Sequence, residues 1–182
     1  MDVIALDIPD VKLIVPAKFG DERGFFSETY NQQRFLDAGI DMTFVQDNHS
    51  LSADVGVLRG LHYQKPPFAQ DKLVRVLKGR ILDVAVDLRK DSPTFGQHVS
   101  AELSAENWTQ ILVPIGFAHG FVTLEPNTEV TYKVTAPYAP DHEDGIMWND
   151  PDLDIDWPIA EDQVQLSAKD KILPAFKDSF TF

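Results

Sequence analysis

Side chains able to transfer protons are concentrated in two polar segments of the chain. One segment surrounds His62 and is followed by Lys72, and the other surrounds His119. An imidazole, with a pKa near ~6.5, is the natural proton acceptor at neutral pH. A pocket that combines it with the ammonium of Lys72 and the phenol of Tyr132 indicates proton chemistry next to a carbonyl group.

Composition excludes several other kinds of chemistry. The chain contains no cysteine, which rules out disulfides, thiolate nucleophiles and cysteine-ligated zinc or iron–sulfur sites. Its 16 basic and 29 acidic residues give a net charge of −13, which argues against duplex DNA and anionic membranes as partners. A few converging Arg and Lys side chains are still able to bind a small anionic molecule.

Short β-branched and aromatic runs between closely spaced Gly and Pro residues indicate an all-β fold. Leu73 to Leu88 is predicted to be a hairpin that turns at Lys78-Gly79, and its second strand alternates as a half-buried strand would. Further strands are expected at Thr109–Val113, Phe117–Leu124 and Glu129–Thr135. With 182 residues, of which 43% are apolar, the chain is expected to form one domain, residues 1–182.

Helical signals are few. Asn31 to Ala38 is predicted to be a short helix that Gly39 stops, and Ser167 to Asp170 matches a capping box. Pro140 to Pro158 is expected to form covering loops. The N-terminus lacks the pattern of a signal peptide, and no apolar run approaches the ~20 residues of a membrane span, so a cytoplasmic location is expected.

The spacing of polar residues resembles two cupin motifs. The first runs through Gly56, His62, Gln64, Lys72 and Gly79, and the second is Pro114-x-Gly116-x-x-His119. The resemblance implies a jelly roll, also called a double-stranded β-helix. Cupins carry metal ligands where this chain has Gln64 and Lys72. Because amide oxygen is a weak ligand and an ammonium repels cations, we expect no metal.

Six blocks of sequence further resemble the dTDP-4-dehydrorhamnose 3,5-epimerase family, in order and spacing, from about Asp21 to Pro174. They are Asp21–Glu28, Gln46–Ser50, Arg59–Gln64, Lys72–Val76, Gly116–Phe121 and Ser167–Asp170. The resemblance implies inversion of C3 and C5 in a dTDP-linked 4-keto-6-deoxyhexose, giving dTDP-4-dehydro-L-rhamnose. Both carbons flank the C4 ketone, so their protons are removed through an enolate and no cofactor is expected.

The resemblance also implies four catalytic roles. His62 is the base, and Asp170 fixes its tautomer and stabilises the imidazolium, as in a catalytic triad. Lys72 stabilises the enolate charge beside the ketone oxygen. Tyr132 protonates the sugar ring from the opposite face.

Substrate-binding residues follow from the same resemblance. Arg23, Arg59 and Lys169 are candidates for the diphosphate, and Phe19, Phe26 and Tyr138 for stacking on thymine. Gln46, Glu28 and Asn48 are candidates for hydrogen bonds to base, ribose or sugar, and His119 for one to the sugar or ketone. Family members are homodimers with exchanged N-terminal strands, so Phe19, Arg23 and Phe26 are expected to serve the partner's site.

Strand parity raises one difficulty. Arg59 and His62 are three residues apart, so a regular strand would place them on opposite faces. A bulge at Gly60 would re-aim one of them; otherwise Arg59 points away from the sugar.

Three alternatives remain open at this stage. The first is a related enzyme that epimerises C3 or C5 only, or acts as a 3,4-ketoisomerase. A non-catalytic cupin that binds a sugar nucleotide is the second, and a metal-dependent cupin oxygenase the third. The sequence leaves the pathway end product and the order of the two inversions undetermined.

Overall fold

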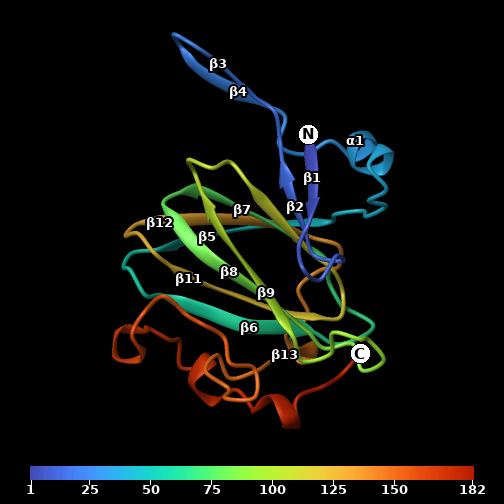
Figure 1. Ribbon diagram of the computed structural model, residues 1–182, viewed down its shortest axis with the longest axis vertical. Helices are drawn as coiled ribbons and strands as arrows, with labels where there is room; N and C mark the ends of the chain where they lie inside the picture. The colour runs from blue at the N-terminus through green and yellow to red at the C-terminus, as the bar shows by residue number, and fades with distance from the viewer.

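The computed structural model describes residues 1–182 and confirms the predicted all-β jelly roll (Figure 1). Two antiparallel sheets face each other. The larger has the order β1 (Asp2–Ala5), β2 (Lys12–Val15), β10 (Gln110–Val113), β7 (Lys72–Lys78), β12 (Thr128–Val134) and β5 (Gln46–Ser52). The smaller has the order β13 (Glu143–Gly145), β6 (Leu58–Gln64), β11 (Phe117–Thr123), β8 (Arg80–Asp87) and β9 (His98–Ser104).

From β5 onward the chain changes sheet at every connection except the one between β8 and β9. The predicted hairpin over Leu73–Leu88 is therefore wrong, because β7 and β8 belong to different sheets and do not pair. The predicted turn at Gly79 exists, with φ of +79°, but it carries the chain across the barrel. A Cβ at Gly79 would lie 2.3 Å from Thr128 Oγ1, so this crossing requires glycine.

Strand β8 is buried on both faces, whereas the sequence predicted a half-buried strand. Ile81 and Ala85 face the core between the sheets, while Val84 and Val86 face outward. The outward face is covered by the C-terminal part of the chain, including Trp148 and the other members of that cluster. Figure 1 shows this segment, coloured orange to red, running along the outside of β6. The expectation of covering loops at 140–158 is confirmed there, with β13 and a short 3-10 helix, η1 (Pro140–His142), added.

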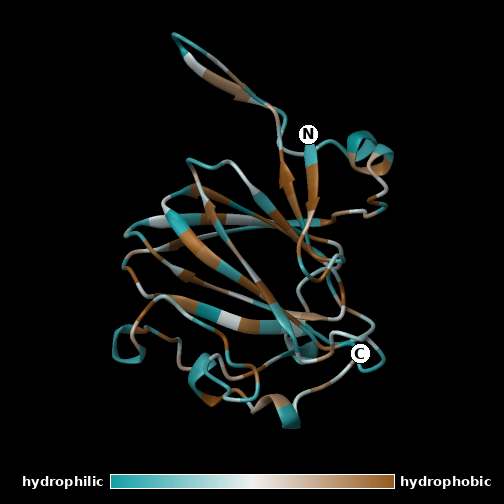
Figure 2. Ribbon diagram, viewed as in Figure 1, coloured by the Kyte–Doolittle hydropathy of each residue, from teal (hydrophilic) through white to brown (hydrophobic).

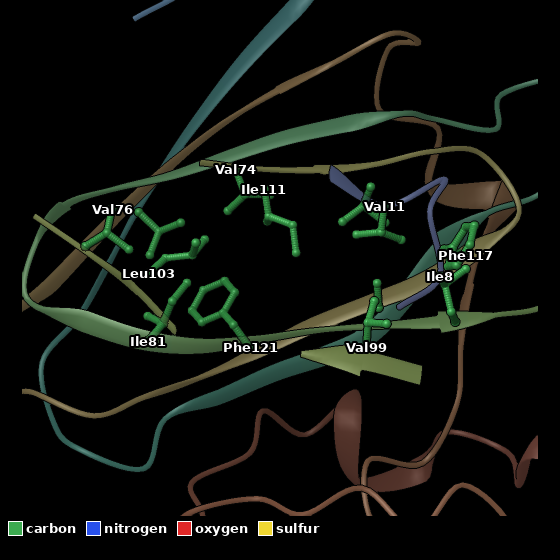
Figure 3. Packing of buried hydrophobic residues seen from close by; sticks show 13 residues of the cluster. Ile8, Val11, Val74, Val76, Ile81, Val99, Leu103, Ile111, Phe117 and Phe121 are labelled. Carbon is green, nitrogen blue, oxygen red and sulfur yellow. The ribbon is translucent and has the colours of Figure 1, made fainter. Parts of the chain in front are cut away.

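A cluster of 13 buried aliphatic and aromatic residues forms the apolar part of the core between the sheets. Figure 3 shows its side chains filling the space from Val76 and Leu103 at one end to Ile8 and Phe117 at the other. Phe121 and Tyr132 pack at the border of this core, and both also line the cavities described below. The apolar core thus forms one side of these cavities.

The predicted helix is present as α1 (Gln32–Asp37), with Asn31 as N-cap and Gly39 just beyond its end. The other helical turns are 3-10 helices: η2 (Glu161–Gln163), η3 (Asp170–Ile172) and η4 (Phe176–Asp178). At η3 the amide of Asp170 donates to Ser167 Oγ at 3.1 Å, as the predicted capping box requires. None of the helices has the length and apolarity needed to cross a membrane.

A hairpin of β3 (Lys18–Asp21) and β4 (Gly24–Ser27) projects away from the barrel (Figure 1). Its base is held by Trp108, whose indole donates to Ser27 Oγ at 3.0 Å and packs edge-on against Phe25. Phe19 and Phe26 are 64% and 71% exposed. Figure 2 shows apolar residues along this projecting hairpin as well as along the barrel strands.

Candidate active site

A histidine–carboxylate pair stands at the centre of the site. His62 Nε2 lies 2.5 Å from Asp170 Oδ1. This hydrogen bond links strand β6 to the C-terminal segment. Burial by itself raises the pKa of Asp170, but hydrogen bonds from His62 and Ser167 bring it below its usual value. The ionised carboxylate accepts only, so Nε2 carries the proton and Nδ1 is left as the proton-accepting nitrogen.

Of the two alternatives that strand parity left open, the structure has the bulge at Gly60. His62 pairs with His119, and Arg59 pairs with Phe121. A spacing of three residues on β6 therefore lies opposite a spacing of two residues on β11. Gly60 has φ of +133°, and a Cβ there would lie 2.5 Å from the Gly120 Cα. The extra residue places Arg59 and His62 on the lining of one cavity. Arg59 therefore points toward the site, and the strand-parity difficulty disappears.

Lys72 and Tyr132 reach the site from the opposite sheet, on β7 and β12. The Lys72 ammonium donates to the His62 main-chain oxygen at 3.2 Å. Burial lowers the pKa of Lys72 to about 8, with partial opposition from the charges of Asp83 and Glu143. Burial also raises the pKa of Tyr132, so its phenol is protonated at neutral pH and can act as an acid.

His119 forms a second pair with a carboxylate. Its Nε2 lies 3.0 and 2.9 Å from the two oxygens of Asp83, which is completely buried on β8. The two histidines therefore bond to separate carboxylates, and no cluster of three or more His, Asp or Glu side chains is arranged to hold a metal ion. The expectation of no metal stays a prediction, which elemental analysis of the purified protein tests.

Two adjoining cavities share His62, Lys72 and Tyr132. The first, of about 100 Å³, is further lined by Gln46, Asn48, Tyr63, Gln64, Gln70, Tyr138 and Glu143. The second, of about 220 Å³, is further lined by Ser50, Arg59, His119, Phe121, Ser167, Lys169 and Asp170. All four predicted catalytic residues and six of the ten predicted binding residues thus lie around one continuous polar interior.

The other four predicted binding residues lie elsewhere in this chain. Phe19, Arg23 and Phe26 are on the projecting hairpin, where Arg23 binds Asp21. Glu28 follows that hairpin and forms an ion pair with Arg34 at 3.1 Å. Within one copy of the chain these residues do not line either cavity.

Sequence reasoning missed two residues that shape the site, Asp83 and Glu143. Asp83 carried a signal, because a carboxylate in the middle of an apolar strand needs a buried partner. Glu143 accepts a hydrogen bond from Tyr138 at 2.6 Å and pairs with Lys169. Burial by itself raises the pKa of Glu143, but these two partners bring it below its usual value. Glu143 lies among other acidic residues, so nothing in its local sequence distinguished it.

A family of known proteins matches nearly the whole chain. The sequence model of the family described as dTDP-4-dehydrorhamnose 3,5-epimerase matches residues 5–178. The chain belongs to this family.

Relatives of the epimerase family resemble the chain over nearly its whole length. A dTDP-4-dehydrorhamnose 3,5-epimerase from Pseudomonas aeruginosa is 56% identical, across 100% of this chain and 99% of its own. The crystal structure of the epimerase from Bacillus anthracis, with TDP and PPi bound, is 53% identical with a TM-score of 0.92, covering 96% and 98% of the two chains. The Legionella pneumophila epimerase in complex with dTDP-4-keto-L-rhamnose is 50% identical, with a TM-score of 0.91 and coverages of 96% and 92%.

Proposed function

We propose that this protein inverts C3 and C5 of dTDP-4-dehydro-6-deoxy-D-glucose to give dTDP-4-dehydro-L-rhamnose. The observation that carries the proposal is the placement of His62 and Tyr132 on opposing sheets, where they line the same two cavities. Inversion needs a base on one face of the sugar ring and an acid on the other. A ring held between the sheets meets both.

The first step is proton removal from a carbon next to the ketone. His62 Nδ1 takes the proton, and Asp170, bonded to Nε2, stabilises the resulting imidazolium. The electron pair moves into the C4 carbonyl and forms an enolate oxygen. The Lys72 ammonium stabilises that oxygen, a preorganised contribution of about 3 kcal/mol to lowering the barrier.

The second step returns a proton to the other face. The Tyr132 phenol donates it to the carbon, the enolate collapses to the ketone, and the configuration is inverted. His62 then releases its proton to solvent and the Tyr132 phenolate takes one from solvent, which readies the pair for the second carbon. No electrons leave the sugar, so no redox cofactor is part of the reaction. His119, held by Asp83 on the same sheet as His62, is placed for a hydrogen bond to the sugar or its ketone.

The nucleotide end of the substrate is assigned to the basic side of the second cavity. Arg59 and Lys169 line it, and a guanidinium fork suits diphosphate oxygens. These local cations allow a chain with a net charge of −13 to bind an anionic substrate. Gln46 and Asn48, which share a side-chain hydrogen bond of 2.9 Å, are assigned to polar groups of the substrate.

A second copy of the chain completes the site in this proposal. Exposed aromatic rings on an isolated hairpin are costly in water, and they are typical of an interaction surface. The hairpin carrying Phe19, Arg23 and Phe26 is then inserted at the partner's nucleotide site, which makes the protein a homodimer. The cytoplasmic location expected from the sequence belongs to the same proposal and is tested by cell fractionation.

Nuclear magnetic resonance of dTDP-4-dehydro-6-deoxy-D-glucose in heavy water tests the proposed reaction. With the pure protein, deuterium from solvent is expected at both C3 and C5, accompanied by the signals of the inverted sugar. Label at one carbon alone would identify a mono-epimerase. Binding without label would identify a non-catalytic sugar-nucleotide protein.

A further inference from the structure

Gln64 occupies a position where cupins carry a metal ligand, and here its side chain is bound entirely to backbone. The residue is 4% exposed. Its Nε2 donates to the carbonyl oxygens of Phe68 at 2.6 Å and Pro137 at 3.2 Å, and its Oε1 accepts from the Ala139 amide at 2.8 Å. Both amide hydrogens and the oxygen are therefore in use.

Two other glutamines hold the same short segment, Ala136–Ala139. Gln70 Nε2 donates to the Ala136 carbonyl at 2.7 Å, and Gln46 Oε1 accepts from the Tyr138 amide at 3.0 Å. The segment lies between the end of β12 and the start of η1, so its backbone has no strand partner of its own. Four consecutive residues are instead fixed by three glutamine side chains, all of which line the first cavity.

The segment carries Tyr138 to the wall of that cavity. Tyr138 is 57% exposed, and its hydroxyl donates to Glu143. Glu143 also binds Lys169. Tyr138, Glu143 and Lys169 are therefore connected in a row across the two cavities, and the segment sets the position of Tyr138 at one end. A shift of the Ala136–Ala139 backbone would move the Tyr138 phenol relative to His62 and Lys72.

Only glutamine satisfies the bonds at position 64. Glutamate cannot donate to the two carbonyls, and methionine can neither donate nor accept comparably. We propose that Gln64 is a positioning residue, which clamps the Ala136–Ala139 segment and thereby holds Tyr138 against the sugar-binding cavity. The inference rests on the proposed function for its kinetic consequence, but the clamp itself is measured on the protein without substrate.

Hydrogen–deuterium exchange of the full-length protein tests the clamp directly. In Gln64→Met, which keeps similar volume, loss of the bond to Ala139 is expected to speed exchange of that amide about tenfold. Gln163→Glu, an exposed glutamine with no side-chain hydrogen bond, is the control and should match wild type. Unchanged exchange at Ala139 in Gln64→Met would overturn the clamp. If that variant fails to fold, Gln64→Ala, which also removes the acceptor of the Ala139 amide, provides the same comparison.

A double-mutant cycle tests whether Gln64 acts through Tyr138. Gln64→Met is expected to lower kcat about tenfold in the wild-type background and less than twofold in Tyr138→Ala. Equal losses in both backgrounds would show that Gln64 has only a general structural role and would overturn the positioning proposal. Absence of epimerase activity in the wild type would contradict the proposed function, while the exchange result at Ala139 would still decide the clamp.

Discussion

His62 and His119 are register partners on neighbouring strands, yet each ring bonds to its own carboxylate. Asp170 reaches His62 from 108 residues away, through the C-terminal segment that covers the smaller sheet. Asp83 reaches His119 from the adjacent strand β8. The half-buried His62 ring lines both cavities, whereas His119 lines only the second cavity and is buried together with Asp83. The two pairs therefore differ in their access to a substrate, which suits His62 to proton transfer and His119 to a fixed hydrogen bond.

Asp170→Asn is expected to lower kcat about 10³-fold, because an amide donates to Nε2 and forces the proton onto Nδ1, the nitrogen assigned to proton abstraction. Rates of deuterium uptake at C3 and C5 provide the measurement, with thermal melting to confirm folding. Ser167→Ala removes the other side-chain partner of Asp170 and serves as the control, with a much smaller loss. Retention of more than a third of wild-type activity by Asp170→Asn would remove Asp170 from the mechanism.

Most residues named from the sequence line the two adjoining cavities, whereas the pairing of strands was predicted less well. Alternating residues in Leu82–Leu88 correctly indicated a strand, but periodicity within a strand carries no information about its partner, and here the chain changes sheet at Gly79. Burial of the outward face of β8 depends on a distant segment around Trp148, which no local pattern reveals. A bulge at Gly60 was one of two possibilities that parity left open for Arg59 and His62, and the sequence alone did not decide between them.

Tyr132→Phe is expected to separate proton exchange from inversion. The base on the His62 side remains and exchanges protons with solvent, but the opposite face has lost its donor. Deuterium should still enter recovered substrate, while formation of the inverted product falls by at least about 100-fold. Phe retains the packing of the ring against the core, so this variant is expected to fold like the wild type. Product formation at the wild-type rate would assign the acid role to another group.

The activity should fall as pH rises above about 8, the value to which burial lowers the pKa of Lys72. Below that pH the side chain is an ammonium that stabilises the enolate, and above it the neutral amine cannot. The expected slope of kcat/KM is about tenfold per pH unit. Lys171→Met, on the exposed surface, should reproduce the wild-type profile. A profile that stays flat to pH 9.5 would contradict the role given to Lys72.

Asp83→Asn should move that alkaline limb to lower pH. The negative charge of Asp83 favours the ammonium form of Lys72, so its removal lowers the Lys72 pKa further below about 8. The pH profile of kcat/KM gives the shift, and circular dichroism shows whether the fold is retained. His119 loses its carboxylate in the same variant, so kcat is expected to fall at every pH. A limb at the wild-type position would mean that Asp83 acts on His119 alone.

Mixed dimers are expected to recover activity lost in two separate variants. His62→Ala removes the base, and Arg23→Ala with Phe26→Ala removes the hairpin groups assigned to the partner's nucleotide site. In a mixed dimer with exchanged hairpins, one of the two sites has an intact base from one protomer and an intact hairpin from the other. Random reassortment makes about half of the dimers mixed, which restores about one quarter of the sites.

Activity of the co-refolded variants, measured at substrate concentrations well below KM, tests this reassortment. Samples refolded separately and then combined are the control, because their protomers have not exchanged. An activity equal to the sum of the two separate variants would show that each hairpin serves its own chain. It would also require another explanation for the exposed rings of Phe19 and Phe26.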